Sequence, residues 1–207
     1  MKLFDVARMP PHVPGLRIGL FGGSFDPPHE GHRAVSLLAM RRLGLDTVWW
    51  LVSPGNPLKD TSHLPSLEQR REAARKLARH PRIVATAIEA AIGTRYSVDT
   101  ISYLKKRCPG VHFVWLMGAD NFVNFHHWKN WREIAKLVPI AIIDRPGSTL
   151  KAMHSPAANA LGRYRLDESD APILAMASPP AFVFLHGPRS SLSSTALRAG
   201  KAQSTGA

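Results

Sequence analysis

The chain has 207 residues, 44% of them hydrophobic, and a single cysteine, Cys108. This length and composition allow one domain with a substantial buried core. One cysteine excludes an internal disulfide framework and a zinc site built from several cysteines, which favours a reducing, cytoplasmic location. No stretch approaches the roughly 20 apolar residues needed to cross a membrane, and residues 1–14 lack the apolar run of a signal peptide.

The formal net charge of +12 favours anionic partners, such as phosphorylated metabolites, nucleic acid or an acidic membrane surface. The basic residues are scattered, and we expect most of them on solvated helix faces. They include Arg41, Arg42, Arg70, Arg71, Arg75, Lys76, Lys105, Lys106 and Arg107. Charge alone leaves open a basic nucleic-acid-binding protein, although no helix-turn-helix, zinc-finger or RNA-binding signature accompanies it.

Strand-like and helix-like patterns alternate along the chain. Short apolar or β-branched runs predict strands, at residues 16–21, 47–52, 82–88, 111–117, 140–143 and 181–185. Amphipathic spacing predicts helices between them, at residues 34–43, 67–79, 98–107 and 131–137. Gly44 is the expected end of the first helix, and Ser66 is the expected cap of the second. Residues 148–180 show weaker periodicity and predict a helical or irregular insertion.

This alternation predicts an α/β fold with a doubly wound, Rossmann-like, mostly parallel sheet and helices on both faces. We expect one domain at residues 16–200, an irregular extension at 1–15 and a disordered tail at 201–207. Ligands of such sheets bind beyond the carboxyl ends of the strands. The polar clusters follow this rule, because each of them comes directly after a predicted strand.

The segment GGSFDPPHEGH, residues 22–32, lies between the first strand and the first helix. A tight loop there presents backbone N–H groups to an anion, the helix N-terminus adds positive potential, and His29 and His32 supply further donors. A His-x-x-His pair also occurs as a zinc half-site, a surface pair or a helix cap. The neighbouring Gly-Gly and Pro-Pro pairs favour the phosphate loop, whereas the spacing matches no dinucleotide fingerprint and no P-loop.

A second polar cluster, LSSTALR at residues 192–198, places hydroxyl groups at the start of a predicted short helix. Ser194 and Arg198 are one turn apart. Hydroxyls and free N–H groups at a helix start suit phosphate oxygens, and a guanidinium can bind them in a bidentate manner. Ser-Ser-Thr is also a common helix cap, so the cluster alone does not decide between the two roles.

A third cluster follows the strand at 111–117. Asp120, after Gly118, offers a carboxylate that can hold a ribose hydroxyl. Trp128 offers a flat surface for a pyridine ring, or it is a core anchor. We expect Trp131 in the core, and we expect the histidines at 126–127 to face solvent because they lack partners at metal-binding spacing.

Two shorter segments complete the set. Lys59, after Asn56, is a flexible charge suited to a monophosphate, or a solvated lysine. The run YSVDT starts at Tyr96 and places Ser97 at the start of a predicted helix. Asp99 in that run is equally a favourable charge in the first turn of the helix.

In this order the motifs resemble the signatures of bacterial nicotinate-nucleotide adenylyltransferases, which belong to the HxGH nucleotidyltransferase superfamily. This chain has Ser97, Leu192 and Leu197 where the family pattern has Thr, Ile and Ile. The resemblance implies transfer of the adenylyl group of ATP to nicotinic acid mononucleotide, giving nicotinic acid adenine dinucleotide and pyrophosphate. It implies direct in-line displacement without a covalent enzyme intermediate, with Mg²⁺ accompanying ATP. The alternatives are nicotinamide mononucleotide or another acceptor of HxGH transferases and, in a different class, nucleic-acid binding.

The resemblance also implies a role for individual residues. The expected catalytic donors to the α-phosphate are His29 and His32. The expected ATP-binding residues are Gly22, Gly23, Ser24, Phe25, His29, His32, Gly118, Asp120, Ser194, Thr195 and Arg198. The expected mononucleotide-binding residues are Ser24, Asn56, Lys59, Ser97 and Trp128, with the indole stacked on the pyridine ring. We expect no resident metal site, no nucleic-acid or membrane partner, and a monomer or weak homo-oligomer.

Overall fold

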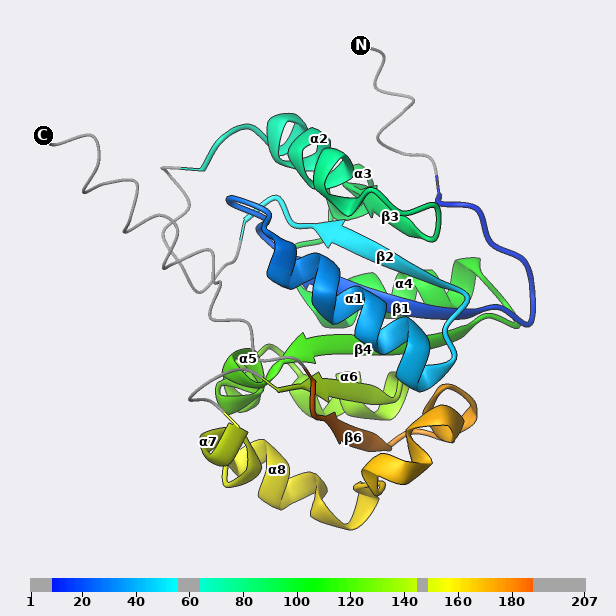
Figure 1. Ribbon diagram of the computed structural model, residues 1–207, viewed down its shortest axis with the longest axis vertical. Coiled ribbons are helices and arrows are strands. Elements are labelled where there is room, and N and C mark those ends of the chain that lie inside the picture. The colour runs from blue at the N-terminus through cyan, green and yellow to red at the C-terminus, as the bar shows by residue number, and fades with distance from the viewer. Residues whose placement is uncertain (1–8, 56–63, 145–148, 188–207) are drawn as a thin grey trace, which may run out of the picture.

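A parallel β-sheet forms the centre of the computed structural model, which describes residues 9–55, 64–144 and 149–187. The strand order is β3-β2-β1-β4-β5-β6, and every pairing is parallel (Figure 1). The strands are β1 (Arg17–Gly23), β2 (Thr47–Val52), β3 (Ile83–Thr86), β4 (His112–Gly118), β5 (Ile140–Ile143) and β6 (Phe182–Leu185). This is the strand order of a doubly wound nucleotide-binding fold, so the predicted fold class is confirmed.

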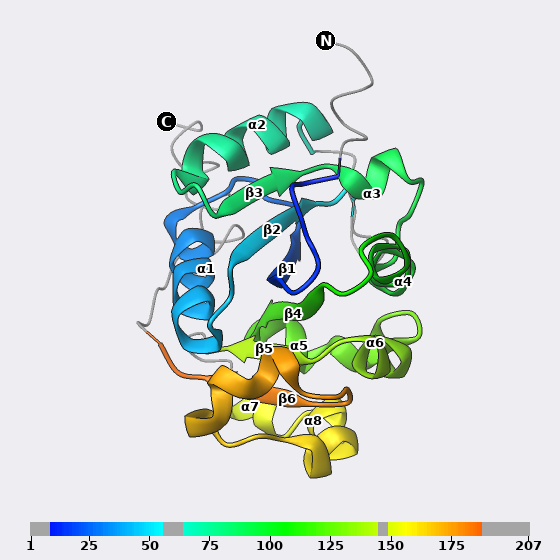
Figure 2. The ribbon, with the colours of Figure 1, turned by 90° about the vertical axis from the view of Figure 1, so that its right-hand side faces the viewer.

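Helices connect the strands and cover both faces of the sheet. Figure 2 shows α1 on one face and α4 and α6 on the other. The α-helices are α1 (Glu30–Leu43), α2 (Leu67–Ala78), α3 (Ile88–Ala91), α4 (Ser97–Arg107), α5 (Ala119–Val123), α6 (Trp131–Leu137), α7 (Thr149–Met153) and α8 (Pro156–Leu161). The 3₁₀ segments are η2 (Phe125–His127), η3 (Gly162–Tyr164) and η4 (Glu168–Met176).

Successive residues of the central strands belong to two different hydrophobic clusters. Trp49 and Leu51 of β2 join the cluster that contains α4 and α6, whereas Val48 and Trp50 join the cluster that contains α1. A strand buried on both faces reads as a continuous apolar run, which is the pattern that predicted β2.

Most element boundaries lie close to the predicted ones. Ser66 caps α2, because its Oγ accepts the backbone N–H of Gln69 at 3.2 Å and its own N–H donates to Oε1 of Gln69 at 3.0 Å. Gly44 ends α1 in the left-handed conformation, with φ of 61°. The prediction of a strand up to residue 88 was wrong, since β3 ends at Thr86 and its Oγ1 accepts the N–H of Ile88 at the start of α3.

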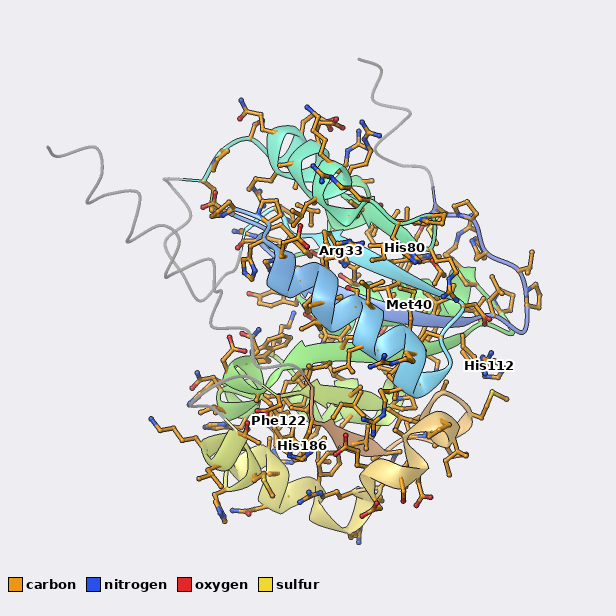
Figure 3. All side chains as sticks on the ribbon, in the orientation of Figure 1. Arg33, Met40, His80, His112, Phe122 and His186 are labelled. Carbon is orange, nitrogen blue, oxygen red and sulfur yellow. The ribbon has the colours of Figure 1, made fainter. Side chains whose placement is uncertain are left out.

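The segment predicted as an insertion is helical over much of its length. Its helices α7 and α8 bury Ala152, Ala157 and Leu161 in the cluster that contains Phe122 of α5 (Figure 3), while η4 buries Leu174 in the cluster that contains α1. The expected tail at 201–207 and most of the expected extension at 1–15 lie outside the described residues. In the part of the chain that the structure describes, no helix is long and apolar enough to cross a membrane.

Candidate active site

The strand order changes direction between β1 and β4, at the centre of the sheet. From β1 the chain adds β2 and β3 on one side, and it later adds β4, β5 and β6 on the other (Figure 1). Doubly wound sheets bind ligands at this point, beyond the carboxyl ends of the strands. The predicted loop at 22–32 begins in the last two residues of β1 here, Gly118 ends β4, and Asp120 lies in the first turn of α5.

The two histidines of the loop lie at the start of α1. The backbone N–H of His29, the N-cap residue, donates to Nδ1 of His32 at 3.1 Å. The ring centroids are 3.9 Å apart, and the two residues are 5% and 8% exposed. Because Nδ1 of His32 accepts a hydrogen bond, the proton of the neutral ring lies on Nε2. His32 therefore offers Nε2–H as a donor. α1 begins at Glu30 rather than at residue 34 because this capping arrangement extends it.

Phe25 holds the loop in a strained conformation. Its φ of 49° lies in the left-handed region, which non-glycine residues rarely adopt. The buried ring stacks on Trp50, with centroids 5.0 Å apart, and contacts the ring of His32 at 4.8 Å. Such strain persists only where the surroundings fix the conformation, and it is concentrated at functional sites.

Gly22 allows the loop to approach the buried indole of Trp115 on β4. A Cβ atom at Gly22 would lie 3.0 Å from Cη2 of Trp115, which is closer than side-chain carbons normally pack. Trp115 also meets Trp128 edge to face, with ring centroids 6.2 Å apart. Trp115 therefore contacts both Gly22, at the start of the first loop, and Trp128, the residue expected to stack on the pyridine ring. Sequence reasoning missed this role because Trp115 lies within an ordinary apolar strand.

Trp128 is half-buried and its orientation is fixed by other aromatic rings. Besides Trp115, the ring of Phe125 packs edge-on at a centroid distance of 5.5 Å. The backbone N–H of Trp128 donates to the carbonyl of Phe125 at 3.0 Å. Trp131 is buried in the core, as predicted.

The histidine pair next to Trp128 differs from the expectation at one position. His127 is exposed, but His126 is half-buried and its Nδ1 is shielded from solvent. The prediction that both face solvent was wrong for His126, because η2 turns it against the protein when Phe125 enters the core.

Lys129 connects the Trp128 segment to the start of α4. Its Nζ lies 3.7 Å from the carboxylate of Asp99 and 4.2 Å from the centroid of the Tyr96 ring. Tyr96 is the N-cap residue of α4, and Ser97 is the first residue of that helix. These contacts bring Trp128 and the N-terminus of α4, which are distant in sequence, to the same part of the molecule.

Arg70 departs most clearly from the sequence prediction. It was expected on a solvated face, but it is only 3% exposed. The guanidinium donates hydrogen bonds of 2.8 Å to the carbonyl oxygens of Ser24 and Ser53, in the loops after β1 and β2. Arg70 is buried in line with Ala74 and Ala78 on α2. That i, i+4, i+8 spacing is the signal that could have identified it as buried.

Glu89 lies beneath the start of α4. It is 6% exposed, and its Oε1 accepts the hydroxyl of Thr100 at 3.1 Å. The Thr100 hydroxyl is also 3.0 Å from that of Thr94. Burial raises the pKa of Glu89 to about 7, and the hydrogen bond from Thr100 opposes this effect. Sequence reasoning missed Glu89.

Not all expected site residues can be located. Asn56, Lys59, Ser194, Thr195 and Arg198 lie outside the described residues. The others lie near the carboxyl edge of the sheet, in the last residues of β1 and β4 or on the segments that follow β1, β3 and β4: Gly22, Gly23, Ser24, Phe25, His29, His32, Ser97, Gly118, Asp120 and Trp128. Among the residues that the structure describes, no group of three or more His, Cys, Asp or Glu side chains could hold a metal ion.

Comparison with known proteins agrees with this arrangement. Residues 20–200 match a family model described as cytidylyltransferase-like, so fold and family place the chain among the nucleotidyltransferases. It is 56% identical over 183 residues to a probable nicotinate-nucleotide adenylyltransferase of Bradyrhizobium sp. (strain ORS 278), covering 88% of this chain and 95% of the relative. It is 54% identical over 190 residues to the corresponding protein of Mesorhizobium japonicum, covering 92% and 97%. The chain belongs to the nicotinate-nucleotide adenylyltransferase family.

Solved structures show the same fold. A nicotinic acid mononucleotide adenylyltransferase of Plasmodium falciparum, complexed with NaAD, is similar with a TM-score of 0.63 and 17% identity, covering 89% of this chain and 83% of that chain. A second structure of that protein, complexed with APC, has a TM-score of 0.60 and covers 88% and 82%.

Proposed function

We propose that this chain transfers the adenylyl group of ATP to nicotinic acid mononucleotide, giving nicotinic acid adenine dinucleotide and pyrophosphate, a step of NAD biosynthesis. The observation that carries the proposal is the pairing of His29 and His32 at the N-terminus of α1, beside the point where the strand order changes. Further support comes from the family membership and from Trp128, whose ring packs on Phe125 and whose neighbour Lys129 pairs with Asp99 in the first turn of α4.

The reaction needs positioning and charge stabilisation more than acid–base chemistry. A phosphate oxygen of the mononucleotide attacks the α-phosphorus of ATP, and the bond to the bridging oxygen breaks in line as pyrophosphate leaves. The attacking phosphate is already ionised at neutral pH, so no protein base or nucleophile is required. Donors placed where charge develops accelerate such transfers. Nε2–H of His32 is one such donor, and His29 acts beside it at the N-terminus of α1.

We assign the ATP phosphates and ribose to two groups of residues. The loop residues Gly22, Gly23, Ser24 and Phe25, with Gly118 and Asp120, are the described part of the proposed ATP site. Ser194, Thr195 and Arg198 complete it in the part of the chain outside the described residues. Mg²⁺ enters with ATP as part of the substrate complex and shields the phosphate charge.

The mononucleotide site is proposed to lie between Trp128 and the start of α4. The indole stacks on the pyridine ring, and backbone N–H groups at Ser97 and after Trp128 meet its carboxylate. The ion pair of Lys129 with Asp99 connects the two segments at the surface. Ser24, together with Asn56 and Lys59, binds the monophosphate.

A pyrophosphate-release assay with ATP and Mg²⁺ tests this function. The purified protein is supplied with nicotinic acid mononucleotide or nicotinamide mononucleotide in parallel reactions. We expect the acid to be used about 30- to 1,000-fold more efficiently, because the amide leaves buried N–H donors facing another donor. Equal use of both substrates contradicts the acid preference. Release with neither substrate contradicts the proposed reaction.

A further inference from the structure

Four backbone carbonyl oxygens converge on the guanidinium of Arg70. Nη1 donates to the carbonyls of Ser24 and Ser53, at 2.8 Å each, and Nη2 donates to that of Pro54 at 3.3 Å. Nε donates to the carbonyl of Pro65 at 3.0 Å. The acceptors come from three segments: the loop after β1, the loop after β2 and the approach to α2. One side chain thus holds together segments that are far apart in sequence.

A packing role does not explain a cation at this position. Burial lowers the pKa of Arg70, and the charge of Asp26 raises it, but a guanidinium keeps its proton in proteins. Taking such a charge out of water is unfavourable unless hydrogen bonds compensate it. The neighbouring buried residues of α2, Ala74 and Ala78, are small and apolar. The forked donor itself is therefore the feature that needs a role.

The hydrogen bonds to Arg70 set the direction of two peptide groups. In a planar trans peptide the C=O and N–H bonds point in opposite directions. The Ser24 carbonyl faces the guanidinium, so the N–H of Phe25 points away from it. In the same way the Pro54 carbonyl directs the N–H of Gly55 away. Arg70 is thus one of the contacts that hold Phe25 at its positive φ.

We propose that Arg70 is a positioning residue of the nucleotide site, which draws in the carbonyl oxygens of the loops after β1 and β2 and so turns their amide N–H groups toward the phosphates. This inference rests on the proposed function, which assigns phosphates to these loops. The Ser53 N–H also donates to the Gly23 carbonyl at 2.9 Å, so a backbone hydrogen bond joins the starts of the two loops as well. A lysine keeps the charge but lacks the planar fork that reaches several carbonyls at once.

The test compares Arg70→Lys and Arg70→Gln with Arg75→Lys and Arg75→Gln as matched controls on the same helix. Arg75 is exposed and pairs with Glu72 on the surface. Calorimetry measures the dissociation constant of ATP with Mg²⁺, and steady-state assays measure kcat and the KM values of both substrates. Both measurements are made at a temperature at which circular dichroism shows that each variant is folded. We expect Arg70→Lys to weaken ATP binding by about tenfold and to lower kcat by about 10²-fold, as misplacement of a binding group by about 1 Å can do. Both Arg75 variants should stay within about twofold of the parent.

Arg70→Lys keeps the length and charge of the side chain, so it carries the test even if Arg70→Gln does not fold. A folded Arg70→Lys protein with a lower melting temperature, but with parental ATP affinity and kcat, overturns the proposal and leaves Arg70 a structural residue only. ATP binding is measured without the acceptor. If the parent binds ATP but makes no dinucleotide, while Arg70→Lys loses ATP affinity, the proposed reaction fails and the role of Arg70 stands.

Discussion

His32 shows how one backbone contact prepares a side chain for chemistry. Its Nδ1 is occupied by the N–H of His29, and its ring packs against Phe25. The ring is therefore fixed in direction as well as in tautomer, and it is almost fully buried before any substrate arrives. A donor fixed in advance stabilises developing charge without reorganising during the reaction.

We expect His32→Ala to lower kcat by about 10²-fold or more, the usual effect of removing one transition-state donor. His80→Ala is the control, because Nδ1 of His80 likewise accepts a backbone N–H, that of Arg82, in the turn between α2 and β3 (Figure 3). Steady-state rates of pyrophosphate release measure both variants. Turnover of His32→Ala within a few-fold of the parent removes His32 from the mechanism.

Glu89 makes stability depend on pH. Its pKa in the fold is about 7, against an ordinary value of 4.5, because burial disfavours the charged form. Below pH 4.5 the Glu89 carboxyl is protonated in both the folded and the unfolded chain, so its burial does not lower the free energy of unfolding. Between pH 4.5 and about 7 the unfolded chain releases the proton first, so the free energy of unfolding falls as pH rises, by up to about 3 kcal/mol.

Glu89→Gln should abolish this dependence, since the amide keeps an acceptor for Thr100 and carries no charge. Urea unfolding at several pH values measures the difference between variant and parent. We expect the variant to gain stability relative to the parent from pH 5 to 8, whereas Glu72→Gln, at an exposed site, should show no such gain. A constant difference across this range contradicts the effect of burial.

The sequence predicts some side chains better than others. Ser66 was recognised because its cap is made within its own turn. Arg70 was misplaced because its acceptors, such as the carbonyls of Ser24 and Pro54, belong to other segments, and a charged side chain favours water in the absence of partners. Local hydrogen bonds can be read from sequence, whereas those made across the fold cannot.

Helix α1 is tied to the sheet by a short chain of hydrogen bonds. The indole N–H of Trp50 on β2 donates to the hydroxyl of Ser36 at 2.8 Å, and this hydroxyl donates to the carbonyl of His32 at 2.9 Å. All three residues are buried. The first turn of α1, which carries the proposed catalytic donor, is therefore connected to the neighbouring strand.

Ser36→Ala should lower the free energy of unfolding by about 1 to 3 kcal/mol, because it leaves the buried N–H of Trp50 without its acceptor. Thr47→Ala is the comparison, since the Thr47 hydroxyl donates to the Arg82 carbonyl at an exposed position. Denaturant unfolding compares the two. An equal and small loss in both variants means that the Trp50 contact contributes little.

The Trp128 segment and the N-terminus of α4 form the proposed pyridine site only as a pair. Trp128→Ala removes the stacking surface, so we expect a higher KM for the acid mononucleotide with nearly unchanged ATP binding. His127→Ala, at the exposed neighbour, is the control. Kinetics with each substrate varied in turn measure the effect. An unchanged KM for the mononucleotide in Trp128→Ala contradicts stacking by Trp128.

The topology could be predicted from the sequence because the strands are short apolar runs and the longer helices between them show amphipathic spacing. β5 and α6 have the predicted bounds, since apolar runs such as 140–143 are short and clearly delimited. The insertion was less predictable, because α7 and α8 are brief and bury small residues such as Ala152 and Ala157. Helices of one or two turns show little periodicity and are stabilised by tertiary packing.

The central place of β1 has a consequence for how the protein is made. Among the strands that the structure describes, β1 is synthesised first, but its second neighbour, β4, begins only at His112. Until β4 has left the ribosome, one edge of β1 keeps its hydrogen-bonding groups open beside apolar residues such as Ile18 and Leu20, which invites association with other chains. We expect a chain ending after Arg107 to sediment as aggregate in cell-free synthesis without chaperones, and the full chain to stay in the supernatant. Equal recovery of both in the supernatant would show that the growing chain protects this edge in another way.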